Sequence, residues 1–337
     1  MNRPKNKTII QKYLDHYNHS PQSRKMRESN LRFFFGEYFP LGNGTKSKTW
    51  FNYDGHIFDI DNEKIIDYFD YLKTLDTVSI TTRKNRWHIF ISFLNYTMYI
   101  YRKYNFIIAK PPKEFVSFEN AVSKKTKVKS NRKIFATKEE IQKILDYLNA
   151  HNFKHYLIFR IFVETGMRKG ELINAKYTEL EPEERFINPE KGKKDEKYYF
   201  FTESLAKLLK IYLQERKSLK IQKNFLFLTN GFEKYSNRAF NLILKGNISK
   251  GKNGELIEHI GVLDAIGIDK VQRNITCHTF RRTINDFRKD MGCPNEDRKI
   301  LLGHKIRDVN VRSYTNSDYK RLRILFDKWN PYKDLKL

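Results

Sequence analysis

Apolar residues recur at helical spacing through the first third of the chain, and polar residues fill the positions between them. One series runs through residues 8–17, a second through 30–39 and a third through 63–73, and each gives one apolar face. A fourth and longer series runs through residues 81–101. This pattern predicts four helices, with residues 41–58 as a loop or a small hairpin among them.

The pattern changes after residue 110. The next stretch opens with two prolines and ends in residues 123–133, of which six of eleven are basic and none is acidic. This composition is typical of a solvated tether, and a basic tether can also follow a phosphate backbone. The sequence therefore divides into a helical domain (1–110), a basic linker (111–133) and a second domain (134–337).

The second domain opens with a helix start signal. Thr137 and Glu140 have the spacing of a capping box, and the apolar stripe of a helix follows. Further along, residues 155–175 predict an apolar helix that ends near Gly166 and is followed at once by another helix. Arg168 then lies at a helix junction, where its guanidinium and the N-terminal amides of a helix can share one anion.

Two short strand-like runs in residues 185–201 flank a charged turn that contains a glycine. They predict a β-hairpin with Lys191, Lys193 and Lys194 near its tip. Residues 245–256 are rich in Gly, Lys and Asn and predict an exposed loop. The fold class that follows is mainly α with a small β-sheet.

The charge of the chain narrows the choice of partner. Its 337 residues include 65 Lys and Arg against 39 Asp and Glu, a formal net charge of +26. Basic side chains gain affinity by displacing counterions from phosphates, so nucleic acid is the expected partner and an anionic membrane surface the second choice. Arg83, Lys84 and Arg86 crowd the start of the fourth helix. In so basic a chain this cluster becomes a candidate DNA contact, and not only a solvated helix start.

Other classes of protein fit the sequence less well. No apolar run approaches the roughly 18 residues of a membrane span, and the polar start has no signal-peptide core, so we expect a soluble, cytoplasmic protein without a membrane partner. Two cysteines, Cys277 and Cys293, suit a reducing compartment. A zinc site made from them with His278 and His304 would lack a C-x-x-C knuckle, so we expect no metal.

The most informative chemistry lies in the segment TCHTFRRTINDFRKDMG. Its apolar residues define one buried helix face, while His278 and Arg281 lie side by side near the amino end of the same helix. Another helix follows, Gly303 caps it, and His304 comes directly after the cap. Tyr314 lies ten residues further on.

Together, five motifs resemble those of the tyrosine recombinase (phage integrase) family: ETGMRKGEL, the hairpin lysine in EKGKKDEK, HTFRR, LLGH and YTN. The first domain is similar to that family's helical, SAM-like core-binding domain, and VSITTRKNRWHIFISFLNY is similar to its last DNA-facing helix. The resemblance implies that the second domain is the catalytic domain. It implies these catalytic residues around a scissile phosphate: Arg168, Lys191, His278, Arg281 and His304, with Tyr314 as the nucleophile.

The chemistry of a phosphodiester explains these residue types. Attack by a tyrosine passes through a crowded state with extra charge on the non-bridging oxygens, which Arg168 and Arg281 can bind with two guanidiniums. His278 is the candidate base or proton shuttle, because a phenol has an ordinary pKa of about 10 and must lose its proton. His304 would donate a hydrogen bond to the phosphate.

The resemblance assigns one further role, to a lysine, and two nearby residues have roles that do not follow from the family motif. A hairpin lysine protonates the departing 5′ hydroxyl; we take Lys191, the first of the motif, with Lys193 and Lys194 as alternatives. Arg282, where many relatives carry a histidine, becomes another phosphate contact. Glu171 either orients the side chain of Arg168, three residues earlier, or forms an ordinary structural ion pair with it.

The implied enzyme is a site-specific DNA recombinase that cuts one strand at a time and passes through a Holliday junction. It would act as a homotetramer on paired double-stranded DNA sites. No metal, nucleotide cofactor or small-molecule substrate is required, because the phosphotyrosine conserves the bond energy for religation. A mobile-element integrase is the first interpretation. A chromosome-dimer resolvase, a type IB topoisomerase and a catalytically inactive DNA-binding relative are the alternatives.

The tail, residues 317–337, predicts one more helix. Leu322, Leu325, Phe326 and Trp329 share one face, and that face has to be buried. It can fold back on its own domain or dock on a neighbouring protomer. The resemblance favours docking in trans, because family members often place this segment on a neighbour.

Overall fold

The computed structural model describes residues 3–36, 51–75, 77–108, 134–189, 197–250, 255–304 and 319–332. The chain divides into two compact units, Met1–Ser130 and Asn131–Leu337, and each unit has its own hydrophobic core. The predicted linker, residues 111–133, lies outside the described residues.

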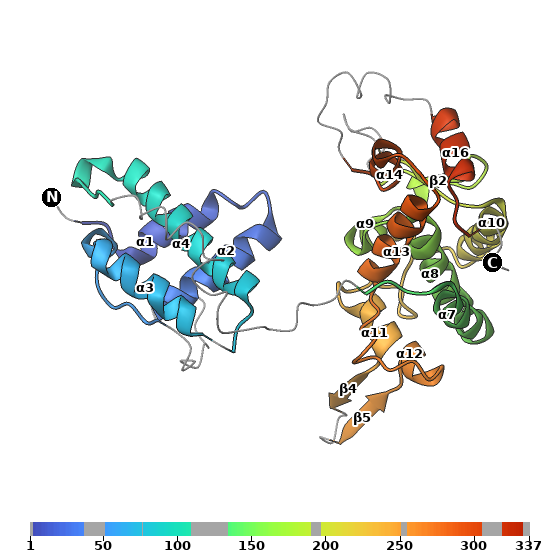
Figure 1. Cartoon of the computed structure of the whole chain (residues 1–337), viewed down its shortest axis with the longest axis horizontal. Helices are drawn as coiled ribbons and strands as arrows, with labels where there is room; N and C mark the ends of the chain where they lie inside the picture. The colour runs from blue at the N-terminus through green and yellow to red at the C-terminus, as the bar shows by residue number, and fades with distance from the viewer. Residues whose placement is uncertain are drawn as a thin grey trace. The chain divides into compact units, whose positions relative to one another are not determined.

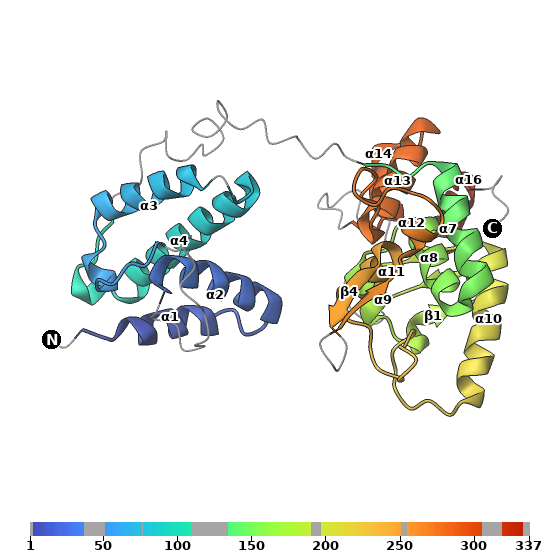
Figure 2. The same cartoon turned by 90° about the horizontal axis from the view of Figure 1, so that it is seen from below.

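The first unit is helical, as predicted (Figures 1 and 2). Its described elements are α1 (Asn6–Asp15), α2 (Pro21–Phe35), the 3-10 turn η2 (Ile57–Asp59), α3 (Asn62–Thr74), α4 (Ile80–Ile100) and the 3-10 turn η3 (Arg102–Tyr104). Side-chain caps fix two of the helix starts. Asp61 accepts a hydrogen bond from the backbone N–H of Lys64, and Ser79 accepts one from that of Thr82.

Aromatic rings fill much of the core of the first unit. Phe34 of α2 has its ring centroid 4.7 Å from that of Tyr68 on α3 and 4.2 Å from that of Phe90 on α4. α1 joins the same core through Tyr13, whose ring lies 5.3 Å from Phe93. One ring cluster therefore holds four helices together, and the apolar faces predicted from the periodicity are the buried ones.

The second unit is mainly helical. Its described helices are α7 (Lys138–His151), α8 (Phe153–Thr165), α9 (Lys169–Asn174), α10 (Glu203–Ser218), α11 (Ala239–Lys245), α12 (Val262–Ala265), α13 (Cys277–Asp290), α14 (Asn295–Leu301) and α16 (Tyr319–Lys328), with the 3-10 turn η4 (Tyr177–Glu179). The predicted capping box starts α7: the Glu140 carboxylate accepts from the backbone N–H of Thr137, and the Thr137 hydroxyl accepts from that of Glu140.

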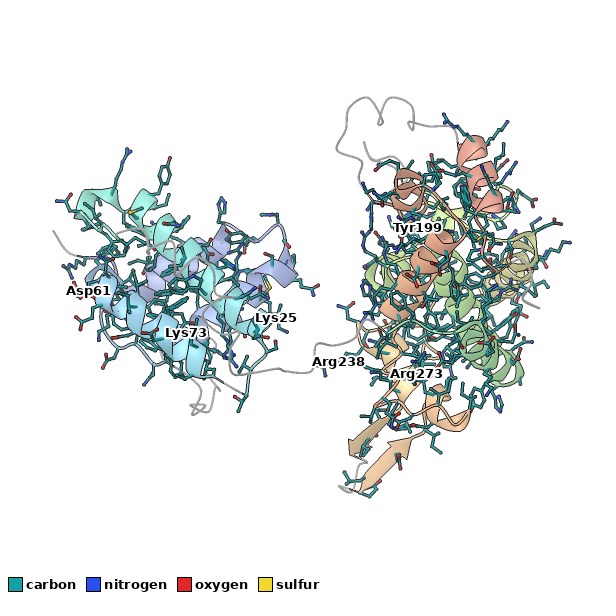
Figure 3. The ribbon with its side chains drawn as sticks, viewed as in Figure 1. Lys25, Asp61, Lys73, Tyr199, Arg238 and Arg273 are labelled. Carbon is teal, nitrogen blue, oxygen red and sulfur yellow. The ribbon has the colours of Figure 1, made fainter. Side chains whose placement is uncertain are left out.

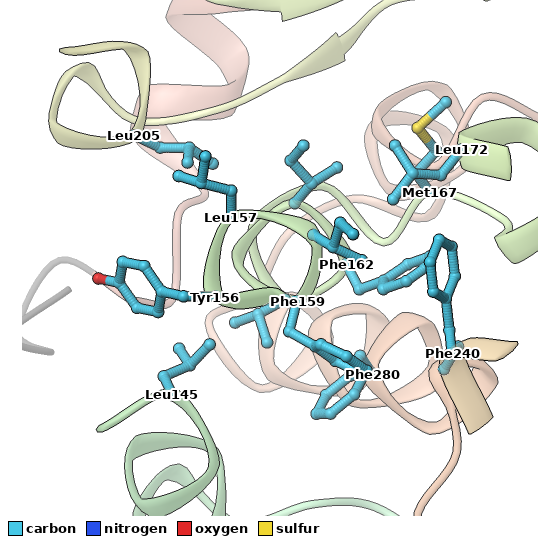
Figure 4. Packing of buried hydrophobic residues seen from close by; sticks show 14 of the residues in the cluster. Leu145, Tyr156, Leu157, Phe159, Phe162, Met167, Leu172, Leu205, Phe240 and Phe280 are labelled. Atoms are coloured by element: carbon cyan, nitrogen blue, oxygen red, sulfur yellow. The ribbon is translucent and has the colours of Figure 1, made fainter. Parts of the chain in front are cut away.

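α8 runs through the middle of this unit, and side chains on all its sides are buried (Figure 4). Phe159 packs against Phe280 of α13, with 6.1 Å between ring centroids. Even the charged residues of α8 are enclosed, because Arg160 and Glu164 form a salt bridge in which both side chains are fully buried. A helix held on every side gives a fixed base to the residues that follow its end.

Two small antiparallel sheets complete the second unit. The first has the order β1 (Leu180–Glu181), β2 (Phe186–Ile187) and β3 (Tyr199–Phe200). β2 and β3 form the predicted hairpin, and β1 is an additional strand that the sequence pattern did not indicate.

The second sheet corrects one prediction. The stretch expected to be only an exposed loop forms β4 (Asn247–Lys250) and β5 (Leu256–His259), a hairpin that extends away from α11 and α12 (Figure 1). All four β5 residues are exposed. With neither face buried, the strands have no need of the apolar alternation by which a strand is recognised in sequence.

α16 is the helix predicted in the tail, and its apolar face packs on its own unit. Phe326 is 1% exposed and lies in a cluster with Phe186, Phe200 and Leu301. Two ion pairs join the helix to the start of the β2–β3 hairpin region: Arg185–Asp327 and Arg323–Glu184. Across the described ranges, no helix is long and apolar enough to cross a membrane.

Candidate active site

Arg168 occupies the junction between α8 and α9, as predicted. α8 ends at Gly166, whose φ of 63° is left-handed, and α9 begins directly after Arg168. Glu171 accepts hydrogen bonds from the backbone N–H and from the Nη1 of Arg168, each at 3.0 Å. The Arg168 side chain is 44% exposed. It is therefore held on one side by a carboxylate and remains accessible to an anion on the other.

Arg281, on α13, approaches the same junction from the interior, with only 6% of its surface exposed. Its Nη1 donates to the carbonyl oxygen of Gly166 and its Nη2 to that of Leu302, both at 2.7 Å. Burial, and then the charge of Arg168, lower the pKa of Arg281. A buried cation next to a second cation favours an anion between or beside them.

The two predicted histidines lie near these arginines. Partial burial and the charges of Arg282, Arg281 and Arg168 lower the pKa of His278, in the first turn of α13. Partial burial and the charges of Arg281 and Arg168 also lower the pKa of His304. His278 shares α13 with Arg281, and His304 comes two residues after Leu302, whose carbonyl oxygen accepts from Arg281. The structure therefore brings four of the predicted catalytic side chains to one junction, where the same two arginines act on both imidazoles.

The other two predicted catalytic residues lie outside the described residues. These are Lys191, together with its alternatives Lys193 and Lys194, and the proposed nucleophile Tyr314. The described segments on either side of them are the strands β2 and β3 for the lysines, and the end of α14 and the start of α16 for the tyrosine. Their roles stay predictions.

Sequence reasoning missed two residues that contact Glu171: Tyr199 of β3, labelled in Figure 3, and Lys197, two residues before it. The hydroxyl of Tyr199 donates to Oε2 of Glu171 at 2.7 Å, and Nζ of Lys197 lies 3.5 Å from Oε1. Although burial opposes it, the hydrogen bond from Tyr199 and the donors of Arg168 hold the pKa of Glu171 below its ordinary range. Glu171, three residues after Arg168, was a candidate partner of that arginine in the sequence, and the structure shows the ion pair. Tyr199 depends on how β3 packs, which no local pattern reveals.

One of the predicted DNA contacts on α4 does not fit its place in the structure. Arg83 is 1% exposed, and its Nε and Nη1 donate to the carbonyl oxygens of Val78 and Lys73, both at 2.8 Å. Its guanidinium therefore holds the end of α3 and the turn after it, and is turned away from solvent. The charge pattern could not reveal this, because a buried arginine and an exposed one have the same sequence signal.

The other predicted DNA contacts are more accessible. Arg86 is half-buried, with its guanidinium 3.5 Å from the ring centroid of Phe33, and burial lowers its pKa. Lys84 is half-buried on the same helix. Arg282 is half-buried on α13, and its Nη2 lies 3.5 Å from the Thr279 hydroxyl. Contact of these side chains with DNA stays a prediction.

The described part of the chain contains no group of three or more His, Cys, Asp or Glu side chains placed to hold a metal. Cys277 and Cys293 are buried free thiols. Burial raises the pKa of Cys277 to about 12 and that of Cys293 to about 11. Both thiols are therefore protonated at neutral pH, a state that does not favour metal binding.

Comparison with known proteins identifies the family. The model of the phage integrase family matches residues 135–321, more than half of the chain. The chain belongs to the phage integrase family. The resemblance that five short motifs indicated is thereby confirmed, and the chain is a tyrosine recombinase of this family.

Solved structures agree with this family fold. One similar structure is the Tn1549 transposon integrase in complex with a circular intermediate DNA, with 15% identity and a TM-score of 0.62 over 97% of this chain and 100% of that one. Another is the XerH site-specific recombinase bound to difH substrate, with 17% identity and a TM-score of 0.58 over 94% of this chain and 82% of that one. At these identities the likeness shows the fold alone. No curated protein sequence matches the chain significantly.

Proposed function

We propose that this phage integrase family member exchanges DNA strands through a 3′-phosphotyrosine formed on Tyr314. The observation that carries the proposal is the convergence of Arg168 and Arg281 at the end of α8, with His278 and His304 in their field. One guanidinium is enclosed and the other is open to solvent. Such a pair suits the non-bridging oxygens of a phosphodiester, whose charge grows in the transition state.

Proton transfer follows from the charge states of the remaining groups. Partial burial, and then the charges of nearby arginines, lower the pKa of both imidazoles, so neutral forms prevail at pH 7. A neutral His278 can accept the proton of the attacking phenol, and His304 can donate a hydrogen bond to the phosphate. Lys191, or else Lys193 or Lys194, would protonate the leaving 5′ hydroxyl. These are roles proposed from chemistry and from the family.

The proposed partner is double-stranded DNA in the cytoplasm, and the proposed assembly is a homotetramer on two paired sites. The net charge of +26 supports a polyanionic partner. The Tn1549 structure holds a circular intermediate DNA and the XerH structure its difH substrate, which supports the same kind of partner here. We propose the integrase of a mobile element as the biological role.

The proposed docking of the tail on a neighbouring protomer needs one further condition. In the single chain, α16 buries its apolar face on its own unit, around Phe326. Docking in trans therefore requires this face to leave the cluster that it occupies here and to be buried again on a neighbour in the assembled tetramer.

Covalent trapping tests the proposal. The attachment site is identified by sequencing the junction between the replicon that carries the gene and its chromosome. The substrate is a duplex of that sequence with a nick beside the cleavage position, so that the short strand released by cleavage diffuses away and religation cannot occur. We expect a covalent protein–DNA complex with the wild-type protein and none with Tyr314→Phe, while both bind the duplex equally. Tyr319→Phe, a tyrosine five residues further on, is the matched control and should still be trapped.

Trapping by Tyr314→Phe would remove this residue from the role of nucleophile. The same preparation is then offered two copies of the site on one supercoiled plasmid. Strand exchange between the sites is expected. Relaxation of a plasmid that lacks the site, without any exchange, would instead favour an enzyme of the type IB topoisomerase class.

A further inference from the structure

Tyr199 lies between the groups that hold the two arginines of the candidate site. Its side chain is fully buried, and its hydroxyl donates to Oε2 of Glu171 at 2.7 Å. The same hydroxyl lies 3.5 Å from the carbonyl oxygen of Leu302. It also closes the space beside Gly303, because a Cβ added there would lie 2.6 Å from it.

Both neighbours of this hydroxyl hold an arginine. The Glu171 carboxylate accepts from the backbone N–H of Arg168 through Oε2 and from its guanidinium through Oε1. The Leu302 carbonyl accepts from Nη2 of Arg281 at 2.7 Å. The phenol therefore lies between the carboxylate that orients one guanidinium and the main chain that orients the other.

The electrostatic contacts agree with this position. Burial, and then the Glu171 carboxylate, raise the pKa of Tyr199, so the phenol stays protonated and donates. The neutral Tyr199 hydroxyl can hold Glu171 and the Leu302 carbonyl at a fixed separation, and it adds no charge to a site that must receive a phosphate.

We propose that Tyr199 is a positioning residue of the strand-exchange reaction, which sets the separation of the Arg168 and Arg281 guanidiniums through Glu171 and the Leu302–Gly303 turn. The inference rests on the proposed function. Tyr199 acts through these neighbours, and it is a different tyrosine from the proposed nucleophile.

The chemistry makes this separation matter. A phosphodiester transition state gains from both guanidiniums only when each reaches its own non-bridging oxygen, and misplacement by about 1 Å can lower a rate about 100-fold. Binding is less sensitive, because the affinity for DNA comes from many phosphate contacts along the duplex. Loss of the hydroxyl should therefore lower the rate of cleavage and leave affinity nearly unchanged.

The test is Tyr199→Phe, which keeps the ring and removes only the hydroxyl. We expect single-turnover trapping on the nicked duplex to slow by about 10- to 100-fold, with the dissociation constant for DNA within about twofold of the wild type. The matched control is Tyr212→Phe, which removes another buried hydroxyl of the same unit, one that donates to the Leu226 carbonyl at 3.0 Å. This control should trap DNA at the wild-type rate.

A double-mutant cycle separates positioning from general weakening of the fold. If Tyr199 acts through Glu171, then adding Tyr199→Phe to Glu171→Gln should slow trapping much less than it does in the wild type. Multiplicative effects would overturn the inference, as would a wild-type rate for Tyr199→Phe or an equal loss in Tyr212→Phe. A failure of the proposed function would look different, because the wild-type protein would then form no covalent complex or Tyr314→Phe would still form one.

Discussion

Nη1 of Arg281 donates to the carbonyl oxygen of Gly166 at 2.7 Å, across 115 positions of sequence. Carbonyl groups at the end of a helix lack partners within the helix, so this bond satisfies one of them and at the same time holds a guanidinium. The end of α8 and the buried arginine of the candidate site are thus a single structural feature. A change in the conformation of Gly166 should therefore move the Arg281 guanidinium.

Gly166→Ala should weaken both the fold and the site. The residue has a φ of 63°, and an added Cβ would lie 2.8 Å from Cδ2 of Leu302 and 2.9 Å from Cγ2 of Ile284. A left-handed non-glycine residue costs about 1–2 kcal/mol, and overpacking a core about 1–3 kcal/mol. We expect a lower melting temperature, and slower covalent trapping because the carbonyl that holds Arg281 moves.

The matched control for this change is Gly170→Ala, a helical position of α9 where an added Cβ meets nothing within 4 Å. Alanine is the better helix former, so this variant should be as stable as the wild type or more stable by about 0.5–1 kcal/mol. Wild-type melting and trapping by Gly166→Ala would contradict the coupling between the end of α8 and Arg281.

Arg83→Ala and Lys84→Ala should separate a structural cation from a DNA contact. Arg83 donates to the carbonyls of Lys73 and Val78, and a buried polar group left without its partner typically costs about 1–3 kcal/mol. We therefore expect Arg83→Ala to lower thermal stability and to increase hydrogen exchange at the end of α3. Lys84→Ala should leave stability unchanged and reduce the salt dependence of DNA binding by about one phosphate contact.

Fluorescence anisotropy with labelled duplex, titrated at several salt concentrations, gives the slope for each variant. A smaller slope for Arg83→Ala, with its melting temperature intact, would return Arg83 to the DNA interface. A flat salt dependence in the wild-type protein would count against phosphate contacts altogether.

Features that depend on residues close together in the sequence could be predicted, and the exposure of Arg83 and Lys84 could not. The capping box at Thr137 and the end of α8 at Gly166 were predictable, because each depends on bonds between residues a few positions apart. The buried helix faces were predictable because apolar residues recur at helical spacing within each helix. Whether Arg83 or Lys84 reaches solvent depends on the packing of α3 against α4, and both have the same charge in sequence.

The candidate site divides in the same way. Motif spacing identified His278 and Arg281, which share one turn of α13, and their pairing with Arg168 came from the family resemblance. Tyr199 was not identifiable, because its hydroxyl meets Glu171 across 28 positions and only after β3 has packed beside α9. The exposed β4–β5 hairpin escaped prediction because neither face of it is buried in a core.

The histidine at the start of α13 should titrate below its ordinary value in the DNA-free protein. Partial burial and the charge of Arg282 both disfavour the imidazolium, so the pKa of His278 is lowered from about 6.5. Arg282→Ala removes one of the positive charges, and it should therefore raise the pKa of His278. The imidazole of this variant then becomes protonated at a higher pH than that of the wild-type protein.

NMR titration of labelled histidine, with the signal assigned through His278→Asn, measures this shift. Lys289→Ala removes a cation from the last turn of the same helix and serves as the control, with no change expected. A His278 signal that titrates at or above about 6.5 in the wild-type protein would contradict the proximity of the arginines.

The apolar face of α16 offers a test of where the tail is buried. In the structure Phe326 is 1% exposed against Phe186, Phe200 and Leu301, while Ile324 on the same helix is 69% exposed. Loss of a buried phenylalanine typically costs about 3–5 kcal/mol. If the helix packs on its own unit, Phe326→Ala should therefore lower the melting temperature of dilute, DNA-free protein, and Ile324→Ala should not.

Assembly on DNA separates this cis arrangement from docking on a neighbour. If α16 exchanges between protomers only in the synaptic complex, Phe326→Ala should also weaken the pairing of two sites, measured by gel shift, while a single protomer still binds one site normally. A melting temperature that is unchanged at low concentration, together with a lost synaptic complex, would indicate that the face is buried only in trans. Normal pairing by a destabilised Phe326→Ala protein would leave the helix as a cis element and exclude exchange as a requirement, because the same side chain cannot be dispensable to the interface that it is proposed to fill.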